Sequence, residues 1–544
     1  VRGRQKEADR TDAFGLDLMD RYFGQYWGRM GLDRERFLNL GRHDYAWGPQ
    51  FSMTVLALRT AGLANGVSEL HGSVARRMWA HIWPERPVEE VPITHITNGI
   101  HVPTFTSQEI GTLFERYLGP DWYMGSQRPE NIKRIDEIYN EELWRSHEIN
   151  RARLVRTCRE QLVAQYKRRN APRKVLDSIE KTLAPDVLTI VFARRFATYK
   201  RAFLLIQDPQ RLEALINNEH CPIQFIFAGK AHPRDNEGKG LVQQIYQFAN
   251  RPSVRNRFVF LENYDMHLAR HLLQGADVWL NTPRRPFEAC GTSGMKAAIN
   301  GAVNFSILDG WWCEGYRDAA GWSIGNGEEY EDHAFQDAVE SQALYNILEN
   351  EVVPCFYDRK NGDLPAGWLI KMKASMKMAM EKFCSLRMVM EYSEKLYTPA
   401  ARWHAALTAE GCAEAARLAD RMARLQTHWK SVSIGQPTRE VHGPQRVGDA
   451  FEVTVEVRLG ELLPEEVDVE LYYGHYKSFS ELTDSRVIPM QVIEACGNGS
   501  FRYGCSLACD TAGRFGFSAR ATPRGDDWIK FFPGLITWAE EQPA

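Results

Sequence analysis

Short, continuous apolar runs recur through the middle of the chain, and each one ends in a polar turn. They cover residues 188–193, 223–228, 257–261, 276–281 and 302–307. A run of this length without polar alternation is typical of a strand buried on both faces of a parallel sheet. Helix-like segments separate the runs, so the pattern predicts alternating βα units in a doubly wound, Rossmann-like α/β domain.

The pattern changes after about residue 430 to strict alternation of apolar and polar positions. The alternation is clearest at residues 450–457, 467–473 and 515–521. Period-two runs separated by Gly, Pro and Asp turns predict a C-terminal β-sandwich.

A basic cluster follows the first apolar run and contains Arg194, Arg195, Lys200 and Arg201. Ligands of open α/β sheets bind outside the carboxyl ends of the strands, where Arg makes bidentate contacts with phosphate and Lys supplies a point charge. The cluster therefore predicts an anion site, and a solvated basic loop is the alternative interpretation.

Residues 288–298, Glu-Ala-Cys-Gly-Thr-Ser-Gly-Met-Lys-Ala-Ala, place a carboxylate, small residues and a lysine around one predicted loop-to-helix junction. Unpaired N–H groups and the positive end of a helix dipole favour a phosphate at such a junction, and glycine lets the backbone approach it closely. Lys296 could bind that phosphate or form a Schiff base. A Gly-rich turn followed by a solvated lysine is the alternative.

Composition excludes several other classes of function. The chain has 544 residues, enough for two or three domains, and a net charge of −3 with both signs interspersed. Such a balance favours neither nucleic acid nor an anionic membrane as a partner. The ten cysteines are irregularly spaced, which predicts reduced thiols, as in the cytoplasm. No apolar stretch has the length expected of a membrane-spanning helix, which also fits a cytoplasmic protein.

Seven motifs in a fixed order give a more specific prediction. NGVSELHG, THITNGI, RRFATYKR, GKAHP, FLENYDM, EACGTSGMK and LDGWWCEG resemble those of the α-glucan (glycogen, starch or maltodextrin) phosphorylases, glycosyltransferase family 35. The similarity is greatest to the shorter bacterial and archaeal branch, and it spans roughly residues 40–400.

The resemblance implies a pyridoxal 5′-phosphate (PLP) cofactor. Lys296 matches the lysine that holds PLP as a Schiff base in this family. The remaining residues that the resemblance places around the cofactor phosphate are Gly291, Thr292, Arg194 and Tyr264.

The resemblance also implies the substrate contacts. Arg195 and Lys200 match the pair that grips orthophosphate, and with Lys296 they form the expected catalytic group. Arg194 and Lys230 would add positive charge, which is needed because two neighbouring phosphates repel each other. Positions that contact glucose hydroxyls in the family hold Asn98, Tyr199, Glu288, Cys290 and Gly291.

Three positions depart from the better-known, longer branch of the family. Cys290 replaces a serine, Ser293-Gly294 replaces Gly-Asn, and Asp265 replaces an arginine. Loss of that arginine would reduce positive charge near the cofactor phosphate. The shorter branch shares the Asp, so we interpret it as a branch difference.

The expected architecture is two Rossmann-like domains of the GT-B type, the first incomplete, followed by a β-sandwich. We place their boundaries at residues 1–105, 106–430 and 431–544, with the chain beginning midway through the N-terminal domain after a polar run at residues 1–10. The implied reaction is phosphorolysis of α-1,4-glucan or maltodextrin by orthophosphate to α-D-glucose 1-phosphate, with retention at the anomeric carbon. A homo-oligomer remains open.

Two other functions stay open at this point. One is a nucleotide-sugar-dependent retaining glycosyltransferase on the same architecture, which needs no PLP. The other is a catalytically inactive fragment that binds PLP or glucan. Trp528, Phe531 and Trp538 in the C-terminal region fit either glucan binding or packing within the protein.

Overall fold

The computed structural model of the protein describes residues 12–125, 128–359, 363–441, 443–478 and 481–539. The described residues form two compact units. Unit 1 lies within residues 1–64, 75–93 and 396–544, and unit 2 within residues 65–74 and 94–395. The polar run at residues 1–10 lies outside the described residues. The three domain boundaries expected above stay a prediction.

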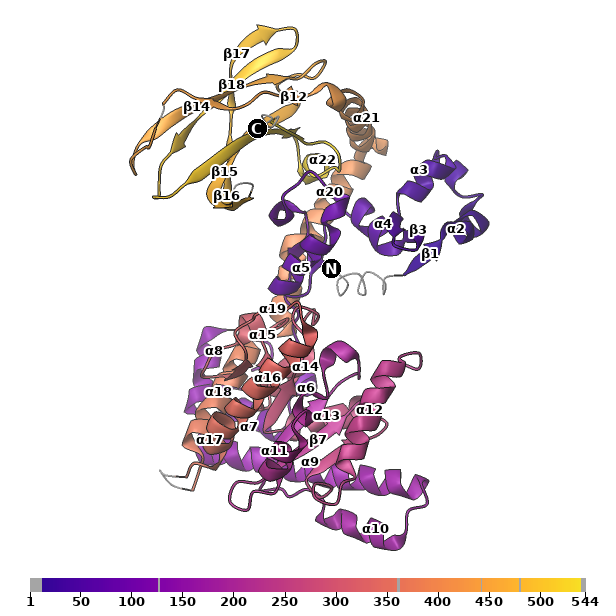
Figure 1. The fold of residues 1–544 in the computed structure, drawn as a ribbon, viewed down its shortest axis with the longest axis vertical. Coiled ribbons are helices and arrows are strands. Elements are labelled where there is room, and N and C mark those ends of the chain that lie inside the picture. Colours follow the sequence, from indigo (N-terminus) through magenta and orange to yellow (C-terminus); the bar gives the residue numbers. More distant parts are fainter. Residues whose placement is uncertain (1–11, 126–127, 360–362, 442, 479–480, 540–544) are drawn as a thin grey trace. The chain divides into compact units, whose positions relative to one another are not determined.

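Unit 2 is built around a six-stranded parallel sheet, in which the strand order is β11-β10-β9-β6-β7-β8. Figure 1 shows helices around this sheet, of which β7 is labelled. The order reverses between β6 and β9, as it does in a doubly wound sheet. The five apolar runs are confirmed as strands, and β11 is an addition to them. The strands are β6 (Leu188–Ala193), β7 (Ile223–Ala228), β8 (Phe258–Leu261), β9 (Val278–Asn281), β10 (Val303–Ile307) and β11 (Gly321–Ile324).

Helices cover both faces of this sheet. Successive strand residues point to opposite sides, so alternate residues pack against different helices. Val191 and Ala193 pack with α9 (Asn140–Arg168) and α13 (Met266–Gly275) on one face. Ile190 and Phe192 belong to the larger core on the other face. The helices that contribute to that larger core include α7 (Gln108–Leu118), α11 (Pro209–Ile216), α12 (Asn236–Ala249), α16 (His333–Ile347) and α18 (Ala366–Lys382).

Shorter elements complete unit 2. A two-stranded parallel sheet pairs β4 (Asn65–Gly66) with β5 (Thr94–His95). The short helices are α6 (Val102–Phe105), α8 (Pro129–Lys133), α10 (Arg173–Ser178), α14 (Thr292–Ala298), α15 (Trp312–Gly315), α17 (Val353–Tyr357) and α19 (Ser385–Tyr392); α5 (Glu69–Trp79) contributes residues to both units.

The C-terminal part of unit 1 consists of two antiparallel sheets that share one hydrophobic core. One has the order β12-β14-β18-β17, with β13 also paired to β14, and the other β16-β15-β19-β20. The alternating runs are confirmed as strands. The bounds are β12 (Ser433–Ile434), β13 (Thr438–Arg439), β14 (Ala450–Arg458), β15 (Val467–Ser478), β16 (Glu481–Pro489), β17 (Gln491–Gly497), β18 (Ser500–Ala508), β19 (Phe515–Pro523) and β20 (Thr537–Trp538).

The rest of unit 1 is helical apart from a three-stranded sheet of order β1-β3-β2. Among the described residues, no helix has both the length and the apolar character needed to cross a membrane. The elements are β1 (Ala13–Gly15), β2 (Arg42–Tyr45), β3 (Gly48–Ser52), α2 (Leu16–Phe23), α3 (Arg34–Asn39), α4 (Met53–Thr60), α20 (Thr398–Thr408), α21 (Ala413–His428) and α22 (Asp527–Lys530).

The three C-terminal aromatic residues make packing contacts inside unit 1. The Trp538 indole N–H donates to the carbonyl of Glu85 at 2.7 Å. The Arg86 guanidinium lies 4.7 Å from the centre of the Phe531 ring, and the Trp528 ring lies edge-on to another indole at 6.0 Å. These contacts favour the packing interpretation over glucan binding.

A buried carboxylate fastens α9 to the parallel sheet. Asp277 accepts hydrogen bonds from His147 Nε2 at 2.8 Å, from Arg151 Nη1 at 2.6 Å and from the Thr189 N–H at 2.8 Å. Burial alone would raise the pKa of Asp277, but Arg151 and His147 outweigh it and hold that pKa below its usual value. Asp277 is therefore an anion, and it balances the positive charge of Arg151, which is also buried.

We expect Asp277→Ala to destabilise unit 2 by about 3–5 kcal/mol, because removing one partner of a buried ion pair leaves the other charge uncompensated. The thermal unfolding midpoint should fall by several degrees. Asp136→Ala is the matched control: Asp136 pairs with Lys377 at 2.7 Å, but 57% of its side chain is exposed, so its removal should cost no more than about 1 kcal/mol. Equal midpoints for the two variants would contradict the assignment.

Candidate functional site

The basic cluster after β6 converges on one carboxylate. Arg194 Nη2 and Lys200 Nζ donate to the same oxygen of Glu288, Oε2, at 2.7 and 2.6 Å. Arg194 and Lys200 are buried, and Glu288 is mostly buried. The chain therefore brings together three of the predicted site residues from the ends of β6 and the segment after β9.

Backbone contacts lock these two segments together. Arg201, which adopts a left-handed φ of +45°, donates from Nε to the Thr282 carbonyl at 3.0 Å and from Nη2 to the Pro283 carbonyl at 2.8 Å. The Arg284 N–H donates to the Tyr199 carbonyl at 2.6 Å. Asp337 receives both guanidinium groups, Arg201 at 2.9 Å and Arg284 at 2.8 Å. The positions of Lys200 and Glu288 are thus fixed through their sequence neighbours.

The cluster carries more positive charge than its carboxylate can balance. Burial and the nearby Arg194 lower the pKa of Lys200 to about 8, although Glu288 opposes the shift. Burial alone would raise the pKa of Glu288, but Arg194 and Lys200 outweigh it and hold that pKa low. Two further nitrogens of Arg194, Nε and Nη1, are buried and find no hydrogen-bond partner in the part of the chain that the structure describes. Buried donors of this kind are costly unless a ligand satisfies them.

Arg195 and Tyr199 lie at the exposed side of the cluster. Arg195 is exposed and Tyr199 is half-buried, and Lys200 Nζ lies 4.8 Å from the centre of the Tyr199 ring. Burial and Glu288 raise the pKa of Tyr199, while Arg194 and Arg195 lower it. The phenol therefore stays protonated and can donate a hydrogen bond.

Tyr264, beyond β8, lies within electrostatic reach of Arg194. Burial raises the pKa of its phenol, and the charge of Arg194 partly opposes the shift. The adjacent Asp265 accepts from the Leu268 N–H at 2.8 Å and caps the start of α13. This contact gives the Asp that departs from the longer branch a local structural role.

The segment after β9 turns sharply into α14. Gly291 has a φ of +89° and immediately precedes the helix. A side chain there would be strained, so the turn requires glycine. Thr292 is the first residue of α14, and Lys296 lies one turn further along.

Lys296 is a half-buried amine without a carboxylate partner among the described residues. Its Nζ lies 4.4 Å from the centre of the Phe105 ring. Burial lowers the pKa of Lys296. A lysine with a lowered pKa is more often neutral and therefore more nucleophilic, which fits the predicted attachment point of a carbonyl cofactor.

Cys290 and Asn98 meet although they are far apart in sequence. Burial and Glu314 raise the pKa of the Cys290 thiol to about 12, although hydrogen bonds from Asn98 lower it. The thiol is therefore neutral. Asn98 is held by its own backbone, because its N–H donates to the Val67 carbonyl at 3.0 Å and its carbonyl accepts from Arg387 at 3.2 Å.

The predicted residues do not all meet by direct contact. Glu288, Arg194 and Lys200 form one cluster, with Arg195, Tyr199 and Tyr264 within electrostatic reach of it. Lys230 is exposed and takes no part in the recorded ion pairs on Glu288. Among the described residues, no group of His, Cys, Asp or Glu could hold a metal ion.

Asp309 was missed by the sequence analysis, although it lies within the LDGWWCEG motif. It is buried, and its carboxyl accepts from the Glu288 N–H at 2.9 Å and from the Gly310 N–H at 2.8 Å. The Trp311 N–H beyond it donates to the Cys290 carbonyl at 2.9 Å. The turn after β10 therefore shapes the backbone that presents Glu288 and Cys290.

Comparison with known proteins agrees with this arrangement. A family model for carbohydrate phosphorylases matches residues 18–320. The chain belongs to the carbohydrate phosphorylase family. A second model, for the glycogen phosphorylase C-terminal domain, matches residues 429–540, which include the two antiparallel sheets.

Several relatives extend the similarity of this phosphorylase-family chain. A maltodextrin phosphorylase of Thermococcus litoralis is 38% identical over 517 residues, 93% of this chain and 59% of the relative. A glycogen phosphorylase of Mycobacterium tuberculosis is 37% identical over 521 residues, 94% of this chain and 60% of the relative. A third, from Aquifex aeolicus, is 40% identical over 368 residues, 68% and 52% of the two chains. The chain thus spans about 60% of the length of the first two relatives.

We expect Asp309→Asn to change how the stability of this phosphorylase-family chain depends on pH. Burial raises the pKa of Asp309 to about 8, despite its two backbone donors. Between about pH 4, near the pKa of an unfolded Asp, and about pH 8, the folded state keeps a proton that the unfolded state has lost, so stability falls as pH rises. Asparagine cannot titrate and removes this slope.

Thermal unfolding at several pH values measures the effect. The thermal unfolding midpoint of Asp309→Asn minus that of the original protein should increase as pH rises from about 5 to about 8. An Asp136→Asn variant controls for the loss of any one carboxylate. Parallel pH profiles for Asp309→Asn and the original protein would show that Asp309 titrates normally.

Proposed function

We propose that this chain provides the catalytic centre of an α-glucan phosphorylase. The reaction is α-1,4-glucan of n residues plus orthophosphate giving glucan of n−1 residues plus α-D-glucose 1-phosphate, with retention at the anomeric carbon. Family membership supports it, as do relatives named maltodextrin phosphorylase and glycogen phosphorylase. The observation that carries the proposal is that two buried cations, Arg194 and Lys200, share the single carboxylate of Glu288 and exceed its charge.

That surplus suits a phosphate ligand. Among the described residues, Nε and Nη1 of Arg194 are buried without a partner, and each of these charged donors could bind a phosphate oxygen. Arg195 and Lys200 would hold orthophosphate. A bound dianion would raise the pKa of Lys200 from about 8 and keep the ammonium charged.

The residues at Lys296 fit PLP as the cofactor. Lys296 offers a half-buried amine with a lowered pKa, and the unpaired nitrogens of Arg194 offer donors for a phosphate. Gly291, Thr292 and Tyr264 would complete the contacts to the cofactor. When bound, PLP would supply a second phosphate group beside orthophosphate, which could act as an acid/base or electrostatic partner; in solution the second pKa of such a group is about 6.

The remaining site residues would orient the glucose unit. Glu288 and Asn98 offer acceptors for sugar hydroxyls, and the neutral groups of Tyr199 and Cys290 offer donors. These side chains are mostly buried or half-buried, so a bound glucan would displace water from the reacting bond. Exclusion of water favours transfer to phosphate over hydrolysis.

The fold supports the wider family architecture. We infer that the parallel sheet of unit 2 is one Rossmann-like domain of a GT-B enzyme, and that the two C-terminal antiparallel sheets form an accessory β-sandwich. The boundaries at residues 105 and 430 belong to this proposal. All ten cysteines are free thiols, which supports a reducing, cytoplasmic location.

The cofactor assignment is tested by labelling. After incubation with PLP and reduction with borohydride, peptide mapping should find a pyridoxyl group on Lys296, together with an absorbance band that reduction removes. Lys296→Arg should lose both signals. Lys230→Arg is the matched control, because Lys230 is an exposed lysine and its loss should leave the label in place.

Absence of the label on Lys296 would overturn the proposal. A protein that stays colourless with added PLP would point to a nucleotide-sugar-dependent transferase. A labelled protein that forms no glucose 1-phosphate from maltoheptaose and orthophosphate would instead be a cofactor-binding fragment.

A further inference from the structure

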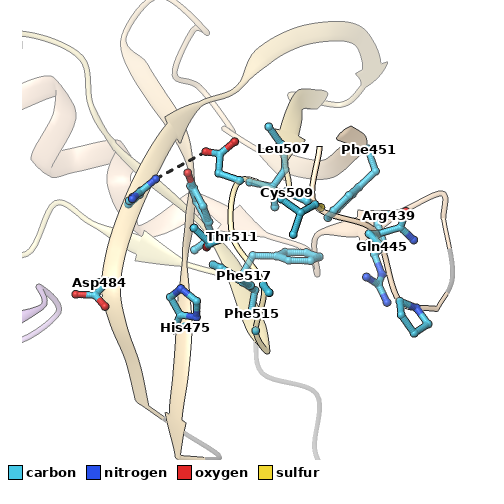
Figure 2. Close-up of a pocket in the computed structure, with 18 of the residues that line it drawn as sticks. Arg439, Gln445, Phe451, His475, Asp484, Leu507, Cys509, Thr511, Phe515 and Phe517 are labelled. Carbon is cyan, nitrogen blue, oxygen red and sulfur yellow. Dashed lines mark ion pairs between the residues drawn. The ribbon is translucent and has the colours of Figure 1, made fainter. Parts of the chain in front are cut away.

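A cavity of about 700 Å³ opens between the two antiparallel sheets of unit 1. Its volume falls in the range of roughly 300–1,000 Å³ that is usual for small-molecule sites. Figure 2 shows His475, Phe515 and Phe517 along one side of the cavity and Phe451, Arg439 and Gln445 along another. None of these residues belongs to the site around Glu288, which lies in unit 2.

Strand register explains why aromatic rings gather there. On β15 and β19 the core pair Leu471–Ala519 is followed by Tyr473–Phe517 and then by His475–Phe515. Residues two apart along a strand point to the same side, so these rings continue the inner face that forms the core. On the facing sheet, Phe451 of β14 is paired with Leu507 of β18.

The inner face is left open at this end instead of being closed by a dry core. Phe515 occupies an inner position, but 38% of it is exposed. The His475 ring lies 4.0 Å from the Phe515 ring at an interplanar angle of 40°. A bulge shifts the pairing of β15 with β16 between Tyr473 and His475, and bulges often redirect side chains beside binding sites. These aromatic rings form a platform on the inner face of the sheet that is open to solvent. A ligand that covered the platform would remove apolar surface from water.

Polar side chains surround this platform, and their charges balance. Arg439 and Arg486 are offset by Asp484 and Asp510 among the lining residues. Arg486 and Asp510 lie 3.8 Å apart with 63% of each side chain exposed, so both can exchange this contact for a ligand. A balanced rim does not select an anion such as a phosphate or nucleotide, and its donors and acceptors suit a neutral ligand rich in hydroxyls.

We propose that this cavity binds an α-1,4-glucan chain at a second site, separate from the site around Glu288. Sugar rings carry apolar C–H faces that can cover Phe515 and His475, and hydroxyls that the rim can pair. This inference rests on the proposed α-glucan substrate. A second binding site on the same polymer raises the effective concentration of glucan at the enzyme without adding a contact in the catalytic centre.

Hydrogen exchange locates the binding. Maltoheptaose, added to the full chain loaded with PLP, should slow amide exchange in peptides that cover residues 507–517, and the β-linked cellohexaose should not. Phe515→Ala should weaken the maltoheptaose affinity read from these peptides by about three- to tenfold, the loss expected when an aromatic contact is removed. Phe532→Ala is the matched control, because Phe532 is 37% exposed, compared with 38% for Phe515, and does not line the cavity.

Arg486→Ala provides a second variant at an exposed position, so the test does not depend on the folding of Phe515→Ala alone. A weaker affinity in both variants, with Phe532→Ala unchanged, supports the second site. No protection at residues 507–517, or equal losses in all three variants, overturns it. Protection confined to unit 2 would reject the cavity while leaving the proposed function intact. Protection at residues 507–517 without a label on Lys296 would reject the proposed function and leave glucan binding in the cavity intact.

Discussion

The site depends on one electrostatic constraint, which is that the buried carboxylate of Glu288 must be neutralised. Arg194 and Lys200 bind the same oxygen of it, and they exceed it in charge. Burial, together with the charge of Arg194, lowers the pKa of Lys200 to about 8, and two nitrogens of Arg194 have no partner among the described residues. A pocket in this state is poised to receive an anion, because an anion both satisfies the donors and balances the charge.

The rest of unit 2 holds this arrangement in place. Arg201 ties the segment after β6 to the segment after β9 through two backbone carbonyls, while Asp309 grips the backbone of Glu288 from the turn after β10. Each of these segments follows the carboxyl end of a strand. Such preorganisation matters at a site that receives an anion, since fixed charges need no rearrangement when the anion binds.

Local sequence patterns predicted the buried strands and several site residues. They did not predict which residues distant in sequence become partners of the site. The buried strands β6 and β7 were found because each is a continuous apolar run, and Glu288 and Lys200 because they lie in recognisable motifs. Asp277, Asp309 and Asp337 were missed, because their importance comes from partners distant in sequence. The cavity was missed for a related reason: alternation predicts that Phe515 faces inward, and it does not show that the facing sheets part there.

Phosphorus NMR of the PLP-loaded protein tests the central claim most directly. If the cations around Glu288 hold the cofactor phosphate, its second pKa should fall well below the value of about 6 found in solution, because positive charge favours the dianion. Arg194→Met should move that pKa back toward the solution value. A phosphorus signal that titrates as it does for free PLP, and that is unchanged by Arg194→Met, would contradict the account.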